Sequence, residues 1–188
     1  MRAPRCLLAG LLAAVPAYAD PAILRQIAEG LASQPSRTAS FTEEKHISSL
    51  TQPLQSRGQM VFRKPDTLEQ HTTAPHPETL VIAGREVSIS RPGAATRRLS
   101  TGDSPALRIL ADTLRGALAG DVAALRRHFR VSEAGPLSAW RITLLPGGNV
   151  TAQVVRRATI DGSFAEVRQI DIAQVGGDEQ RIMLTPER

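Results

Sequence analysis

The first half of the chain shows one helical pattern followed by a long stretch of strand-like alternation. Asp20 and Pro21 suit the N-cap and first turn of a helix that runs to about Ala32. Apolar and polar residues then alternate from about Ala39. We expect four strands before residue 92, in a meander, from the segments ASFTEEKHISSL, QMVFR, TLEQHT and the hairpin LVIAGREVSIS, where Gly84 supplies a positive φ.

The clearest helical signal lies in the second half. Ser104 and Pro105 predict a helix start, leucines follow at helical spacing, and Gly120 predicts its end. Asp121 predicts a second, short helix with Val122, Leu125 and Phe129 on one side. Strand patterns resume around 140–144, 150–155, 170–172 and 182–184. The sequence therefore predicts an α+β fold in which helices cover one face of a curved antiparallel sheet.

The first 19 residues read as a secretory signal peptide. Arg2 and Arg5 precede an apolar run, Cys6 to Val15, and Ala17-Tyr18-Ala19 is a small-x-small cleavage site. The run is shorter than the roughly 20 residues that span a bilayer. Cys6 is the only cysteine and Asp20 would follow cleavage, so we expect a periplasmic protein with no disulfide and no lipid anchor. Residues 20–188 are expected to form a single domain.

Charge changes this picture little. The chain has 23 Lys and Arg against 18 Asp and Glu; without Arg2 and Arg5 the balance is 21 against 18, or +3. Export argues against a nucleic-acid partner, whereas a small positive charge suits transient contact with a membrane surface. The pairs at 97–98, 126–127 and 156–157 could dock on an acidic partner, although solvated arginines explain them equally well.

Candidate chemistry is sparse. The four histidines, at 46, 71, 76 and 128, lack the spacing of metal ligands, and none of the G-x-S-x-G, P-loop or G-x-G-x-x-G motifs is present. The segment DGSFAE, 161–166, is best explained as a turn. Glu43 and Glu44 would lie on opposite faces of a strand, so they cannot form one acid pair there. No catalytic residue, metal or cofactor is expected, and an enzyme is not supported.

Five segments together resemble the LolA family of periplasmic outer-membrane lipoprotein carriers, and more closely its divergent LolA-related branch. The segments are F-x-E-x-K at Phe41–Lys45, P-L-x-S-x-G at Pro53–Gly58, F-x-x-P-x-x-L-E at Phe62–Glu69, A-G-D at Ala119–Asp121 and W-x-x-x-L-x-P at Trp140–Pro146. Each is weak alone, but their order and spacing are specific. The resemblance covers essentially the whole mature chain.

The resemblance implies an incomplete, strongly curved antiparallel β-barrel with a helical lid over its concave face. Family members shield the acyl chains of lipoproteins in that cavity, accept them from an inner-membrane transporter and pass them to an outer-membrane acceptor. We therefore expect a monomeric carrier that needs no cofactor and takes a lipoprotein or another acylated lipid as cargo.

The expected cavity wall combines strand parity with the family pattern. Met60, Phe62 and Lys64 share one face of a strand, and Leu68 and Gln70 share a face of the next. The resemblance makes both faces concave. The predicted lipid-binding residues are Phe41, Met60, Phe62, Leu68, Gln70, Leu80, Ile82, Leu107, Leu110, Leu114, Trp140, Ile142 and Leu144, of which Leu107, Leu110 and Leu114 would belong to the lid. Apolar residues at these spacings are equally suited to a core.

Two departures from the family bear on the cargo. Carriers have an arginine before the proline that hydrogen-bonds to the closed lid, whereas this chain has Lys64, which we expect to act as the lid latch with fewer simultaneous bonds. A tryptophan commonly occupies the position of Gln70. Loss of that apolar surface puts a triacyl cargo in question and leaves another amphiphile open, such as a glycolipid or a polyene lipid.

Two alternatives to lipoprotein carriage stay open. A non-catalytic envelope binding module would dock through the arginine pairs and would have a well-filled cavity. A carrier or product-shaping protein for another amphiphile, or an enzyme on the same fold, would show polar groups converging in the cavity beyond Lys64 and Gln70. The fold alone does not decide between them.

Overall fold

The computed structural model describes residues 21–187. The expected leader at residues 1–19, with Cys6, and the expected N-cap Asp20 lie outside the described residues. The elements, in chain order, are α1 (Pro21–Ala32), β1 (Ser36–His46), β2 (Leu54–Arg63), β3 (Thr67–Ala74), β4 (Glu78–Ala83), β5 (Glu86–Ser90), β6 (Arg97–Ser100), α2 (Pro105–Ala119), α3 (Val122–Arg126), β7 (Phe129–Ala134), β8 (Trp140–Pro146), α4 (Asn149–Ala152), β9 (Val155–Ser163), β10 (Glu166–Gln174) and β11 (Glu179–Pro186).

All the described strands belong to one antiparallel sheet of 11 strands, in the order β6-β5-β4-β3-β2-β1-β11-β10-β9-β8-β7. Strands β1 to β6 pair in sequence order, as do β7 to β11, and the two halves join where β1 pairs with the last strand, β11. The edge strands β6 and β7 do not pair with each other, so the barrel stays open. The expected α+β fold, an incomplete curved barrel with helices on its concave side, is confirmed.

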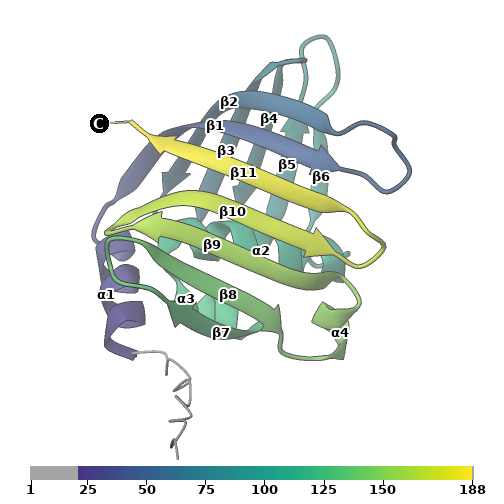
Figure 1. The fold of residues 1–188 in the computed structure, drawn as a ribbon. Helices are drawn as coiled ribbons and strands as arrows, with labels where there is room; N and C mark the ends of the chain where they lie inside the picture. Colours follow the sequence, from purple (N-terminus) through teal and green to yellow (C-terminus); the bar gives the residue numbers. More distant parts are fainter. Residues whose placement is uncertain (1–20, 188) are drawn as a thin grey trace, which may run out of the picture.

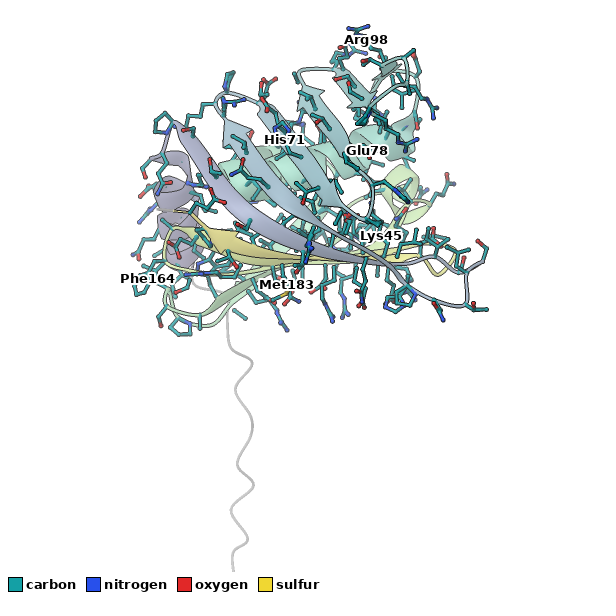
Figure 2. The ribbon with its side chains drawn as sticks, turned by 90° about the horizontal axis from the view of Figure 1, so that it is seen from above. Lys45, His71, Glu78, Arg98, Phe164 and Met183 are labelled. Atoms are coloured by element: carbon teal, nitrogen blue, oxygen red, sulfur yellow. The ribbon has the colours of Figure 1, made fainter. Side chains whose placement is uncertain are left out.

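The sheet curves around α2 and α3, while α1 lies at the end of the sheet where β1 begins (Figure 1). Alternate residues of each strand face this concave side and bury their side chains, as in β11, where Ile182 and Leu184 are buried and Met183 is exposed. Met183 lies on the convex side, which carries charged and polar side chains (Figure 2). The core therefore lies between the helices and one face of the sheet.

Helix α2 begins and ends as its sequence predicts. The Ser104 hydroxyl accepts a hydrogen bond from the Leu107 backbone N–H at 3.2 Å, and Pro105 occupies the first turn. Gly120 ends the helix at φ 69°, and a Cβ there would lie 2.6 Å from the Leu31 Cβ of α1. Glycine is thus required both by the left-handed backbone and by the close approach of the two helices.

The remaining predicted elements need four corrections, of which one is β6 at residues 97–100, a strand that the sequence pattern does not predict. Five strands, not four, precede residue 92, because the hairpin around Gly84, which has φ 55°, contributes two. Phe129 does not extend α3; it begins β7, a strand that the sequence analysis missed. Residues 149–152 form α4, so the strand expected at 150–155 begins only at Val155. The segment 161–166 does contain the turn between β9 and β10.

The only tryptophan of the chain fixes how β8 and β9 pack. Trp140 is buried, and its indole Nε1 donates a hydrogen bond to the Phe164 carbonyl at 2.9 Å. A Cβ on Gly162, its partner in β9, would lie 2.1 Å from the indole ring. The indole therefore occupies the space that a side chain at position 162 would need.

Within residues 21–187, no helix has both the length and the apolar character for crossing a membrane.

We predict that Gly162→Ala lowers the free energy of unfolding by about 1–3 kcal/mol, because the added methyl group must displace a packed indole. Denaturant unfolding followed by the fluorescence of Trp140 measures the effect. The matched control is Gly148→Ala, since nothing lies within 4 Å of a Cβ at that position. Equal stability of the two variants would contradict this description of the Trp140 packing.

Candidate functional site

An apolar-floored pocket opens at the end of the barrel where β1 begins. Its volume is about 500 Å³, within the range of small-molecule sites. The C-terminal turn of α2, the start of β1, the end of β11 and the β9–β10 turn surround it, at the left-hand end of the strands in Figure 1. Its lining residues are Gln34, Ser36, Arg37, Thr38, Ala39, Met60, Phe62, Leu118, Ala165, Glu166, Val167, Leu184, Pro186 and Glu187.

The floor and the rim of this pocket differ in chemistry. Buried residues of two strands form the floor, with Met60 and Phe62 from β2 and Leu184 from β11, and the buried Leu118 at the end of α2 also lines the pocket. The rim carries charged side chains from Arg37, Glu166 and Glu187. An apolar floor with a polar rim suits an amphiphile, because the chain loses its contact with water while the polar end keeps it.

The predicted lipid-binding residues separate into two groups in the structure. Met60 and Phe62 line the pocket. The others lie on the concave face of the sheet or on α2 without lining it. Phe41, Leu68, Ile82, Trp140, Ile142 and Leu144 are buried in the core cluster, Leu80, Leu107, Leu110 and Leu114 pack half-buried against it, and Gln70 is half-buried on β3. Their role in lipid binding stays a prediction.

Several pocket residues were missed by the sequence analysis. Leu184 alternates with exposed residues at the end of β11, so strand parity could have found it. Leu118 follows Leu107, Leu110 and Leu114 at helical spacing. Arg37 lies before the point where the alternation becomes visible, and no pattern in the sequence marks it.

Arg37 joins the two helices that border the pocket. Its Nη1 donates a hydrogen bond to the Leu118 carbonyl at 2.6 Å, at the C-terminal end of α2, and its Nη2 donates one to the Gly30 carbonyl of α1 at 3.4 Å. Burial lowers the pKa of the Arg37 guanidinium below its usual value, although arginine stays charged at physiological pH. One side chain from β1 thus holds both helix ends above the pocket.

Lys64 lies just after β2, and its side chain donates a hydrogen bond to the Ala32 carbonyl at the C-terminal end of α1. Its backbone N–H donates to the Pro35 carbonyl at 2.9 Å. The expected latch residue therefore holds α1 and the α1–β1 loop in this structure, whereas the contact with α2 comes from Arg37.

A second set of contacts holds the outer side of α2. The Asp112 carboxylate accepts hydrogen bonds from Arg115 at 2.6 Å and from His128 Nε2 at 2.9 Å, and Arg115 also donates to the Gly84 carbonyl at 2.6 Å. Burial acts to raise the pKa of Asp112, but the hydrogen bonds and charges of His128 and Arg115 outweigh it, so the pKa lies below its ordinary value. This cluster ties α2 to the β4–β5 turn and to the start of β7.

The concave side also holds carboxylates. Glu43 is buried there among Ser56, Gln70 and Gln180, while Glu44 is on the opposite face, as expected. On β7, the Oε1 atom of Glu133 is buried without a hydrogen-bond partner.

Residues 21–187 contain no group of three or more His, Cys, Asp or Glu side chains that could hold a metal ion.

A further groove of about 550 Å³ lies largely on the convex side, around Thr42, Arg57, Pro75 and Met183. Apart from Glu43, its lining residues are exposed or half-buried, and most are polar or charged. This groove lacks the buried apolar floor that an acyl chain needs, so the pocket beneath α2 is the stronger candidate for lipid binding.

Comparison with known proteins gives a family match over almost the whole chain. Residues 13–187 match the family described as "Outer membrane lipoprotein carrier protein LolA-like". A curated relative, an outer-membrane lipoprotein carrier protein of Pseudomonas entomophila strain L48, is 28% identical over 148 residues, which cover 78% of this chain and 70% of the relative.

Solved structures with similar folds share little sequence with this chain. A LolA superfamily protein from Nitrosomonas europaea is 12% identical, with a TM-score of 0.44 and coverage of 90% of this chain and 92% of that one. Lipoprotein LppX from Mycobacterium tuberculosis is 13% identical, with a TM-score of 0.49 and coverage of 88% and 94%.

We predict that Asp112→Asn lowers the free energy of unfolding by about 1–3 kcal/mol at pH 7, because Arg115 and His128 lose a charged acceptor. The folded-state pKa of Asp112 is lowered, so its stabilisation is present above the unfolded pKa of about 3.9 and is lost as pH falls through the folded pKa. Urea unfolding at several pH values should show the difference from wild type shrinking towards pH 3. Asp103→Asn, at an exposed loop position, is the control. A difference that does not change with pH would contradict a role for the charge.

Proposed function

This chain belongs to the family of LolA-like outer membrane lipoprotein carrier proteins, and from that premise we propose that it is a non-catalytic periplasmic carrier. It shields the acyl chains of a lipoprotein or related lipid in its concave pocket and moves this cargo from the inner to the outer membrane. The observation that carries the proposal is the pocket of about 500 Å³ whose floor is buried and apolar and whose roof is the end of α2.

The energetics favour a protein that shields its cargo throughout transfer. Burying a methylene group is worth about 0.8 kcal/mol, so roughly 15 methylenes amount to about 12 kcal/mol. Release into water would therefore be very slow. Direct contact with an acceptor exchanges one apolar surface for another and removes most of this cost, without nucleotide hydrolysis in the carrier.

Loading requires α2 to move away from the sheet. Arg37 is the polar contact between α2 and the strand that borders the pocket, and Lys64 holds the neighbouring end of α1. We propose that both act as latches, Arg37 on α2 and Lys64 on α1. A charged hydrogen bond contributes about 1.5–3 kcal/mol net, far less than the burial of an acyl chain. Cargo can therefore open these contacts.

The donor and the acceptor follow from the family. We propose an inner-membrane transporter that delivers the cargo, an outer-membrane protein that receives it, transient contact with membrane surfaces, and export through the leader at residues 1–19. The carrier would work as a monomer with one domain, residues 20–188, and without a cofactor.

A second candidate is a carrier or product-shaping protein for another amphiphile, such as a glycolipid or a polyene lipid. The observation that favours it is the group of polar side chains around Glu43 on the concave face. An entirely apolar wall would suit acyl chains alone, whereas these side chains suit a cargo with a polar group.

We predict that Ala39→Phe weakens the binding of an apolar fluorescent probe at least about tenfold, which corresponds to 1.4 kcal/mol. Ala39 lines the pocket beside Met60, so a phenyl ring there occupies the space of the ligand. Titration of the purified protein with the probe measures the dissociation constant.

The matched control is Thr42→Phe, which adds the same ring on the convex face of the same strand. It should leave the dissociation constant within about twofold, since additional surface contacts have small effects. If Thr42→Phe weakens binding and Ala39→Phe does not, the ligand binds in the convex groove and the proposed carrier pocket is wrong.

A further inference from the structure

The concave wall changes from apolar to polar along its length. On β1, the concave positions run from Arg37 at the pocket rim through Ala39 and Phe41 to Glu43 and Lys45. The neighbouring strands change in the same direction, as the concave residues of β2 run from Phe62 and Met60 to Ser56, those of β3 from Leu68 to Gln70, and those of β11 from Leu184 and Ile182 to Gln180. One end of the wall is thus apolar and the other is polar.

Glu43 is the centre of the polar end. Its side chain is 4% exposed. Its Oε2 accepts a hydrogen bond from the Ser56 hydroxyl at 2.9 Å, lies 3.2 Å from Lys45 Nζ, and is 3.5 Å from Gln70 Nε2. Its Oε1 accepts a hydrogen bond from Gln180 Nε2. A buried carboxylate is costly unless such partners surround it, so these five residues form one built cluster.

The cluster has hydrogen-bonding capacity left over. Gln70 and Gln180 each contact Glu43 through Nε2, so their carbonyl oxygens take no part in the contact with the carboxylate. The Lys45 side chain is 44% exposed and has two further N–H groups to donate. The cluster therefore offers both donors and acceptors to a ligand.

The net charge of the cluster selects among headgroups. Lys45 and Glu43 neutralise each other, and the other three residues are uncharged. For an anionic headgroup, the only cation in the cluster is Lys45, which is already paired with Glu43. A cationic headgroup would be repelled by Lys45 and would find the oxygens of the Glu43 carboxylate occupied. An uncharged group with hydroxyls or amides can use both the free donors and the free acceptors.

The position of the cluster fits the far end of a bound amphiphile. Glu43 is four residues along β1 from Ala39, which lines the pocket, or about 13 Å at 3.3 Å per residue. Lys45 lies towards the opposite end of β1 from α1 (Figure 2). The buried side chain of Phe41 lies between the pocket and the cluster on this wall, so a cargo that reaches both must displace it.

We infer that Glu43, Lys45, Ser56, Gln70 and Gln180 bind the uncharged, hydroxyl- or amide-bearing headgroup of the cargo while its chain occupies the apolar end of the wall. This inference rests on the proposed carrier function. It assigns the cargo to the amphiphiles with a neutral polar head.

Four probes with the same dodecyl chain test the headgroup. Dodecyl glucoside carries hydroxyls, N-dodecylacetamide carries an amide, dodecyl phosphate is anionic and dodecyltrimethylammonium is cationic. Below their micelle concentrations, calorimetry should show the glucoside or the amide binding at least about tenfold more tightly than both charged probes, the effect of one or two hydrogen bonds. The neutral probe that binds more tightly shows whether the headgroup of the cargo carries hydroxyls or an amide.

Two variants test the residues. Gln180→Leu and Gln70→Leu should each remove most of the preference for the neutral probe, while the apolar fluorescent probe used for Ala39→Phe, which has no polar headgroup, binds as in wild type. Gln169→Leu, on β10, is the matched control, because Gln169 hydrogen-bonds to Asp171 outside the cluster. Circular dichroism checks that each variant folds. If Gln180→Leu does not fold, the test relies on Gln70→Leu, because Gln70 makes the longer contact with Glu43.

The failures of the two ideas are distinguishable. If all four probes bind with equal affinity, or if the preference survives both leucine variants, the headgroup inference is overturned and the carrier proposal stands. If neither the apolar fluorescent probe nor any of the four headgroup probes binds, the carrier proposal fails and the inference fails with it.

Discussion

The cost of leaving an apolar sheet face in contact with water determines the rest of this structure. The 11 strands do not close into a barrel, so their concave face needs another cover. Burying one large aliphatic side chain contributes about 1.5–3 kcal/mol, and fully buried residues such as Ile170 and Ile182 lie on this face. Helices α2 and α3 supply most of the cover (Figure 1), and the pocket at the end of α2 is where the cover is incomplete.

The helices that provide this cover are held by few polar contacts on the pocket side. Arg37 joins β1 to the ends of both α1 and α2. On the outer side, Asp112 and Arg115 tie α2 to the β4–β5 turn and to His128. Under the proposed carrier function, this asymmetry would let the pocket side of α2 rise while its outer side stays fixed, and the acyl chain would supply the apolar contacts that the helix gives up. A carrier needs this balance, because a firmly closed cover could not be loaded.

Sequence patterns predicted the elements whose residues follow a simple period. The helix from Pro105 to Ala119 and the strand with Met60 and Phe62 emerged from helical spacing and from parity. The edge strand β7 was missed because its concave residues include Glu133, so its alternation is weak. Val150 was assigned to a strand, but it lies in α4, a helix too short to show a period.

The candidate site was less predictable than the fold because it depends on contacts between distant segments. Parity placed Glu43 and Glu44 on opposite faces, but only the register of β1 with β2 and β11 brings Ser56 and Gln180 to Glu43. Lys64 was expected to hold the helical lid, but only the structure shows that the turn after β2 brings its side chain to the Ala32 carbonyl of α1. Arg37 reaches a carbonyl 81 residues away, a contact that no local pattern specifies.

The most direct test of carriage is to measure the mass of the protein purified from the periplasm. The full chain should be expressed in a diderm host, purified without detergent and measured by native mass spectrometry, with fragmentation to identify any bound molecule. The proposed carrier role predicts a species heavier by one amphiphile, which Ala39→Phe should deplete. A protein that carries no amphiphile, and that binds none of the apolar probes when they are supplied, would contradict it.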